Sequence, residues 1–257
     1  MIAFWKRLYY AYLLRHHAIP FLLWENVTQD LPAIAALSPV ENARLRELSS
    51  LFLYQKELSG KNIQLTDTMR VIIASYACLP ILNLGFDHLK GWTTVLVYGD
   101  AFYVSRDEMD SQGLVHHKEA VLSGEAWLQG PVILAWETIQ QDLQNPERGQ
   151  NVIIHEIAHK LDMSNGKANG MPALHLDMPV RNWTDSFSKA YASMQKRYAH
   201  HRHICLNPYA LTAPAEFFAV CSESFFCTPE RLYQNVPDIY RQLCLYYRQD
   251  PLSRLKR

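Results

Sequence analysis

The sequence of 257 residues predicts an α+β fold. Runs rich in β-branched and aromatic residues lie in the first half of the chain, at 92–98, 102–104 and 131–136. From Val152 onward the apolar residues recur with helical spacing, and Gly and Pro break this pattern into a loop at 166–179. Strands followed by helices are typical of an α+β architecture. No repeat or low-complexity linker is present, so we expect a single domain, with a helical and sheet part at about 1–150 and a helical part at about 151–257.

Helices are predicted before the first strand. The aromatic-rich residues 1–37 are expected to contain a helix that packs on the body of the protein. A clearer helix begins after Ser38, because Pro39 suits the first helical position and Glu41 completes a capping box. Its apolar side chains recur at helical spacing, and Gly60 is expected to mark its end.

The remaining elements are predicted from the pattern of apolar residues and from the Gly and Pro residues that interrupt it. A nearly continuous apolar run predicts a buried helix that starts at Thr66 or Thr68 and ends at Pro80. The segment 122–127 is expected to be extended. Helices in the second half are predicted at 183–200, 214–226 and 229–247.

The composition excludes several classes of protein. Lys and Arg total 25 and so do Asp and Glu, which excludes attraction of the whole chain to nucleic acid or to an anionic membrane. The five cysteines form no Cys-x-x-Cys pair, which excludes a cysteine-rich zinc module and a thioredoxin-type motif. The most apolar run, 71–86, is shorter than the roughly 20 residues that span a membrane, and no convincing signal peptide is present. We expect a cytoplasmic protein with reduced thiols and neither a membrane nor a nucleic-acid partner.

The run VIIHEIAHKLD at 152–162 carries the strongest chemical signal. Its two histidines, His155 and His159, are four residues apart, so on a helix both imidazoles project from one face and can bind a single Zn²⁺. Glu156 is placed to take a proton from an attacking water as general base. A chance match on a surface helix is the alternative. The apolar lead-in argues against it, because two histidines and a glutamate on a buried helix need partners.

A catalytic zinc site needs a third protein ligand. No third histidine follows at the spacing of metzincins, so a glutamate from a second helix is favoured. The run at 214–226 supplies Glu216 and Glu223, which are two helical turns apart and near the same face. On spacing alone either is the ligand, and the other forms a hydrogen bond to a ligand or an ordinary salt bridge. The remaining candidates are His175 and the histidine cluster at 200, 201 and 203.

Other polar residues near the motif have plainer interpretations. Asp162 either orients a ligand histidine or closes the helix. The cluster of His200, His201 and His203 is interpreted as a solvated polar turn. Cys221 is interpreted as a buried packing residue, since no activated Cys–His signature surrounds it.

Together with this motif, the runs LSGEAW at 122–127, GPVILAW at 130–136 and EFFAVCSESFF at 216–226 resemble the bacterial Mlc titration factor A family. That family is a group of zinc metallopeptidases whose catalytic site is related to that of the anthrax lethal factor peptidase. The resemblance implies one Zn²⁺ per chain, with Glu216, which opens the Glu-Phe-Phe run, as third ligand. It also implies a catalytic tyrosine seven residues earlier, at Tyr209. A phenol there would stabilise an oxyanion, whereas without the resemblance Tyr209 is one loop tyrosine of 14.

The resemblance also implies what the protein acts on. The expected fold is gluzincin-like, with a small mixed sheet on which the motif helix packs and whose edge strand binds an extended peptide. The expected activity is that of an aminopeptidase on short peptides. A second implied role is binding of the glucose-responsive transcriptional repressor Mlc, which keeps the repressor from DNA and derepresses a sugar phosphotransferase gene.

Overall fold

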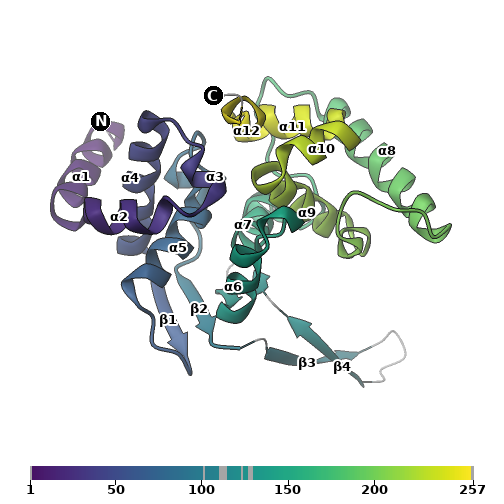
Figure 1. Ribbon diagram of the computed structural model, residues 1–257, viewed down its shortest axis with the longest axis horizontal. Coiled ribbons are helices and arrows are strands. Elements are labelled where there is room, and N and C mark those ends of the chain that lie inside the picture. The colour runs from purple at the N-terminus through teal and green to yellow at the C-terminus, as the bar shows by residue number, and fades with distance from the viewer. Residues whose placement is uncertain (1, 101, 110–114, 123, 127–129, 256–257) are drawn as a thin grey trace.

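The computed structural model describes residues 2–100, 102–109, 115–122, 124–126 and 130–255. Helices α1 to α4 form one side of the molecule and α8 to α12 the other, with α7 between them (Figure 1). The longer helices have these bounds: α1 Ile2–His17, α2 Phe21–Thr28, α4 Pro39–Gln55, α5 Asp67–Cys78, α6 Trp136–Gln144, α7 Val152–Asp162, α8 Val180–Ala199, α9 Pro214–Cys227, α10 Pro229–Asn235 and α11 Pro237–Tyr247. Short helices are α3 Pro32–Ala35, α12 Pro251–Arg254, and the 3-10 turns η1 Phe86–Leu89, η2 Pro146–Arg148, η3 Met163–Asn165 and η4 Pro208–Leu211.

The sheet that supports the site is mixed and has the strand order β1-β2-β6-β5. Its strands are β1 Glu57–Lys61, β2 Thr94–Tyr98, β5 Gly124–Ala126 and β6 Val132–Ala135. Strands β1, β2 and β6 pair in parallel, whereas β5 pairs antiparallel with β6. A separate antiparallel hairpin, β3 Phe102–Met109 and β4 Val115–Leu122, extends away from the body (Figure 1). The helices and the small mixed sheet confirm the prediction of a fold that combines both types of element.

The start of α4 confirms the capping prediction. The Ser38 hydroxyl accepts from the backbone N of Glu41 at 3.3 Å, and the Glu41 carboxylate accepts from the backbone N of Ser38 at 3.0 Å. The predicted end of this helix is wrong, because α4 ends at Gln55 and Gly60 lies in β1. The carbonyl oxygen of Ile63 would lie 2.0 Å from a Cβ at Gly60, so this position serves the close approach of two backbone segments.

The other predicted elements are present with shifted bounds. The N-terminal region contains three helices instead of one, and α5 begins after Thr66, whose hydroxyl accepts from the backbone N of Met69. The predicted strand at 102–104 is part of the longer β3, and the segment 122–127 contains β5, although residues 123 and 127 lie outside the described residues. The predicted helix at 229–247 is two helices, since Pro237 begins α11.

The core lies between the sheet and the central helices. Apolar side chains of α4, α5, α7 and α9 are buried in one cluster, which includes Leu45, Ile73, Ile154 and Phe218. All five cysteines are free, as predicted. Among the described residues, none of the helices combines the length and the apolar character needed to cross a bilayer.

Candidate metal centre

Helix α7 is fixed at its start by two side chains. The amide oxygen of Asn151 accepts from the backbone N of Ile154 at 3.0 Å, and the Asp142 carboxylate accepts from the backbone N of Val152 at 2.8 Å. Both donors belong to the first turn, where backbone N–H groups have no partner within the helix. The helix packs against α9 and contacts β5 and β6. Its apolar residues enter the core, which leaves His155 and His159 on the remaining face.

Helix α9 supplies the opposite wall of the site. It begins with Pro214 at the first helical position, and Glu216 lies in its first turn. Behind Glu216 the helix is buried over Phe217, Phe218 and most of its later residues. The glutamate is therefore held at the junction of two packed helices.

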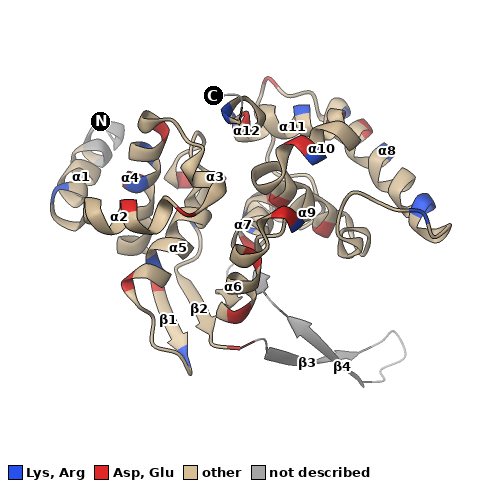
Figure 2. Cartoon of the chain, viewed as in Figure 1, with Lys and Arg blue, Asp and Glu red and all other residues tan. Residues whose placement is uncertain are grey.

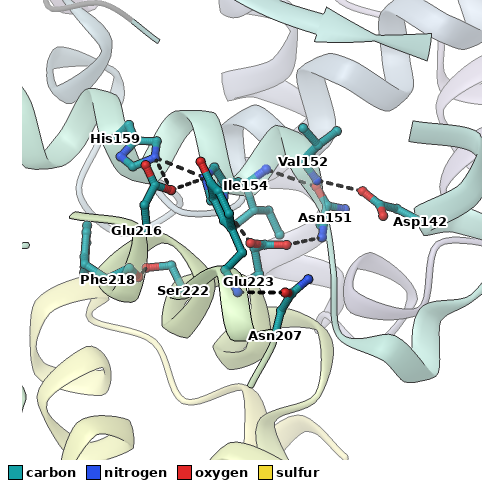
Figure 3. A network of polar contacts seen from close by, with 12 residues as sticks. Asp142, Asn151, Val152, Ile154, His159, Asn207, Glu216, Phe218, Ser222 and Glu223 are labelled. Carbon is teal, nitrogen blue, oxygen red and sulfur yellow. Dashed lines mark hydrogen bonds and ion pairs between the residues drawn. The ribbon is translucent and has the colours of Figure 1, made fainter. Parts of the chain in front are cut away.

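The carboxylate of Glu216 meets both motif histidines. Its Oε2 lies 3.1 Å from Nε2 of His155 and 3.2 Å from Nε2 of His159, and the two Nε2 atoms are 3.1 Å apart. Figure 3 shows the Glu216 side chain turned toward His159. Among the described residues this is the single group of three or more His, Cys, Asp or Glu side chains close enough to share a metal ion.

The spacing of these three atoms fits a zinc ion. In a tetrahedral site with bonds of about 2.0–2.1 Å, ligand atoms lie roughly 3.3 Å apart. The observed separations of 3.1 to 3.2 Å are close to that value. Two imidazole nitrogens and a carboxylate oxygen are also donor types that Zn²⁺ prefers. The residues present therefore fit the metal that the sequence predicts.

Glu223 contacts the other side of His155. Its Oε1 accepts from Nδ1 of His155 at 2.7 Å, and its Oε2 accepts from the backbone N of Asn151 at 2.7 Å (Figure 3). A carboxylate on Nδ1 fixes the ring orientation and leaves Nε2 for a metal. The geometry thus separates the two glutamates that spacing left equivalent, since Glu216 lies in the cluster of donor atoms and Glu223 behind it.

The two carboxylates also shift the pKa values of the donor groups. Burial alone would lower the pKa of His155, but hydrogen bonds with Glu216 and Glu223 raise it well above its usual value. Burial alone would raise the pKa of Glu216, but hydrogen bonds with His155 and His159 hold it well below its usual range. A metal that binds here must displace a proton from the histidine.

Glu156 is buried beside this cluster, with 2% of its surface exposed. Burial raises the pKa of its carboxyl group to about 8. The positive charge of His155 opposes this rise, and the carboxylates of Glu216 and Glu223 add to it. In the described part of the chain, its buried Oε2 has no hydrogen-bond partner. Such an acceptor is uncommon in a folded protein and typical of a site that has a chemical role.

Tyr209 lies on η4, beside His155. The amide oxygen of Asn207 accepts from the backbone N of Tyr209 at 3.0 Å, which positions the turn. The rings of Tyr209 and His155 are 6.0 Å apart between centroids, and Tyr209 is 49% exposed. The phenol is therefore near the donor atoms and open to solvent.

The other candidate residues lie outside the cluster. Asp162 accepts from the backbone N of Gly170 at 2.7 Å, so it anchors the loop after α7. His175 donates from Nε2 to the carbonyl of Tyr246, and His200 donates from Nδ1 to the carbonyl of Lys196.

The histidine cluster at 200, 201 and 203 is exposed, in agreement with a polar turn. Cys221 is fully buried, and burial raises the pKa of its thiol well above the usual value.

Two residues that position the metal-binding helix were not predicted from the sequence. These are Asp142 and Asn151, which fix the start of α7. The signal for Asn151 is present, since Asn is a preferred N-cap residue directly before an apolar helical run. Asp142 lies at the end of another helix, so no local pattern connects it with the motif.

We predict that Glu216→Ala weakens zinc binding more than Glu223→Ala does. Loss of a direct ligand removes one of three bonds from the protein, whereas loss of a partner of a ligand histidine weakens binding by about 10–100-fold. Competition with a chromophoric chelator gives both affinities. Glu230→Ala, at an exposed position on α10, is the control. A weaker affinity for Glu223→Ala than for Glu216→Ala would contradict the assignment.

Known proteins show which family shares these features. A family model described as glucose-regulated metallo-peptidase M90 matches residues 3–248. Mlc titration factor A from Pectobacterium atrosepticum is 42% identical over 232 residues, which cover 88% of this chain and 86% of that protein. The protein of the same name from Salmonella arizonae is 40% identical and covers 91% of this chain and 93% of its own length. The one from Klebsiella pneumoniae strain 342 is 38% identical, with 91% and 88% covered.

These matches extend over nearly the whole chain and include both helices that carry the donor atoms. The metallopeptidase family and the cluster of His155, His159 and Glu216 agree on the type of site. The resemblance to Mlc titration factor A proteins is confirmed. The chain belongs to the M90 family of glucose-regulated metallo-peptidases.

Proposed function

We propose that this protein is a zinc-dependent peptidase that binds one Zn²⁺ through His155, His159 and Glu216. The observation that carries the proposal is the convergence of three donor atoms, 3.1 to 3.2 Å apart, at the junction of α7 and α9. The hydrogen bond from His155 to Glu223 supports it, because this contact is typical of metal-binding histidines.

The residues around the donor atoms suit peptide hydrolysis. A bound zinc ion would polarise the scissile carbonyl and lower the pKa of water. Glu156 accepts the proton of the attacking water and passes it to the leaving amine. Its position supports this role, because the carboxyl group is buried beside the three donor atoms and its Oε2 has no hydrogen-bond partner among the described residues. Tyr209 donates its phenolic hydrogen to the oxyanion that develops on the carbonyl.

The proposed substrate is a short peptide from which the enzyme removes N-terminal residues. Strand β5 supports binding of an extended chain, since it is the edge of the sheet in the described part of the chain and contacts α7. Such an edge offers unpaired backbone groups to a peptide strand.

A second proposed function is binding of the transcriptional repressor Mlc. Three relatives that match about nine-tenths of the chain are named Mlc titration factor A, and this name supports an interaction with that protein. Binding of the repressor and cleavage of peptides are different classes of function. A variant that lacks the Glu156 carboxylate but leaves the protein surface unchanged separates these two functions.

We predict a zinc content of about one ion per chain, because three protein ligands form a single site. The double variant His155→Ala/His159→Ala is expected to lose both the metal and peptide cleavage. Metal analysis by inductively coupled plasma mass spectrometry, with a peptide-library cleavage profile of the same sample, tests both. His200→Ala is the control, since His200 is exposed and its ring contacts the end of α8. One zinc ion retained by the double variant would refute the site.

A further inference from the structure

A large cavity lies next to the proposed active site and has no role in the mechanism above. It is open to solvent, has a volume of about 1150 Å³, and is lined by the end of α8, the segment 201–208, the region of η2 and α10. Arg148, Arg202 and Arg231 line it together with His201 and His203. Figure 2 shows Lys and Arg at the same end of α8.

The charge of this cavity is not balanced. None of the residues that line it is Asp or Glu. Within the described part of the chain, the exposed arginines Arg241 and Arg248 each pair with an aspartate, at 2.6 and 2.5 Å. No such pair forms at the three arginines of the cavity, counted over the same described residues. The residues that line the cavity therefore carry a net positive charge, which attracts an anion.

Neutral carbonyl groups hold this arrangement in place. Arg231 donates to the carbonyls of Glu147 and Arg148, at 3.4 and 3.0 Å. Arg197 donates twice to the carbonyl of His203, at 3.2 and 2.8 Å, and so fixes the loop after α8. Because the acceptors carry no charge, these contacts order the walls without neutralising them.

The cavity is linked to Tyr209. Asn207 and Pro208 line it, and Asn207 accepts from the backbone N of Tyr209. A smaller cavity of about 550 Å³ includes Tyr209 itself and shares Tyr198 and Pro208 with the larger one. The two cavities therefore meet at Tyr198 and Pro208, next to the tyrosine that the mechanism uses.

We propose that the cationic cavity binds carboxylate groups of the peptide substrate, either acidic side chains or the C-terminal carboxylate. Arginine guanidinium groups recognise carboxylates through paired, charge-assisted hydrogen bonds. The cavity is large enough for several side chains, and its apolar walls suit the stems of Glu residues. This inference rests on the proposed peptidase function, and it makes the cavity a determinant of substrate specificity.

Direct binding tests the proposal without cleavage. Four fluorescein-labelled pentapeptides are used. Two contain a pair of Glu residues and two contain a pair of Gln residues, and each sequence is made with an amidated and with a free C-terminus. Each peptide is titrated into the zinc-loaded Glu156→Gln protein, and binding is measured by fluorescence anisotropy. We expect the Glu peptide to bind about tenfold more tightly than the Gln peptide at low salt. This preference should shrink as NaCl is raised, because salt screens exposed charges.

Variants of the exposed arginines locate the effect. Arg148→Gln/Arg202→Gln should remove the preference for Glu, and both positions are exposed, so the fold is expected to persist. Arg181→Gln is the matched control, since Arg181 is exposed in the first turn of α8, roughly 25 Å from the end of that helix. Thermal unfolding of each variant verifies the fold.

The outcomes separate this inference from the proposed function. Equal binding of all four peptides, or a preference for carboxylates that survives Arg148→Gln/Arg202→Gln, would overturn the carboxylate site. An arginine-dependent preference for the free over the amidated C-terminus, equal for Glu and Gln, would assign the cavity to the C-terminal carboxylate. Tight binding of inorganic phosphate, with no preference for the Glu peptides or for the free C-terminus, would assign the cavity to small free anions and overturn the proposal as well. Arginine-dependent binding of the Glu peptide supports it even if wild-type protein cleaves neither peptide, a result that would refute the peptidase function alone.

Discussion

Glu156→Gln is expected to lower kcat/KM for peptide cleavage by about 10²–10⁴-fold, the range for loss of a general base. The amide has nearly the same shape as the carboxyl group but cannot accept the proton of the attacking water. Zinc content is expected to stay near one ion per chain, because Glu156 is not among the three donor atoms that converge. Steady-state kinetics and metal analysis of the same preparation measure both quantities.

The same variant separates the two proposed functions. Repressor binding, measured by surface plasmon resonance, should be unchanged in Glu156→Gln, since the side chain is buried and its loss leaves the surface intact. Glu47→Gln, at an exposed position on α4, is the control for both measurements. Cleavage at the parental rate by the zinc-loaded Glu156→Gln protein would remove this residue from the mechanism. Loss of repressor binding would instead place the repressor at the active site.

The parts of the fold that local chemistry determines were predictable from the sequence. The capping box of Ser38 and Glu41 depends on residues three apart, and the start of α5 after Thr66 on a similar contact. In contrast, β1 was not predicted, because it is a short strand that contains Ser and Gly and is held in place by parallel pairing with β2. Pairing between strands about 35 residues apart leaves no local signal.

The candidate site was likewise predictable from the sequence only in part. The pair His155 and His159 was predictable because four residues on a helix bring two side chains to one face. The roles of Glu216 and Glu223 were not separable by spacing, since both point from the same side of α9 toward α7. Only the packing of the two helices determines which carboxylate reaches the Nε2 atoms and which reaches Nδ1. A ligand contributed by another element is therefore a tertiary property of the fold.

Tyr209 is the residue for which the resemblance added most, because its segment has no catalytic pattern of its own. We expect Tyr209→Phe to lower kcat by about 10²–10³-fold with little change in KM, as for loss of one oxyanion donor. The hydroxyl would act mainly in the transition state, while the ring, 6.0 Å from that of His155, remains in place. Zinc content is expected to stay at the parental level. Steady-state kinetics on a cleavable peptide, with metal measured on the same sample, provide the test.

A packing role for this tyrosine leads to a different result. Tyr209 is 49% exposed, so if it only packed against the loop, its hydroxyl would contribute little and Tyr209→Phe would have nearly parental kcat. Tyr233→Phe is the matched control, because Tyr233 is a comparably exposed tyrosine on α10. A Tyr209→Phe protein with full zinc and a kcat within about twofold of the Tyr233→Phe control would exclude the oxyanion role. Zinc and Glu156 would then carry the chemistry without a phenol donor.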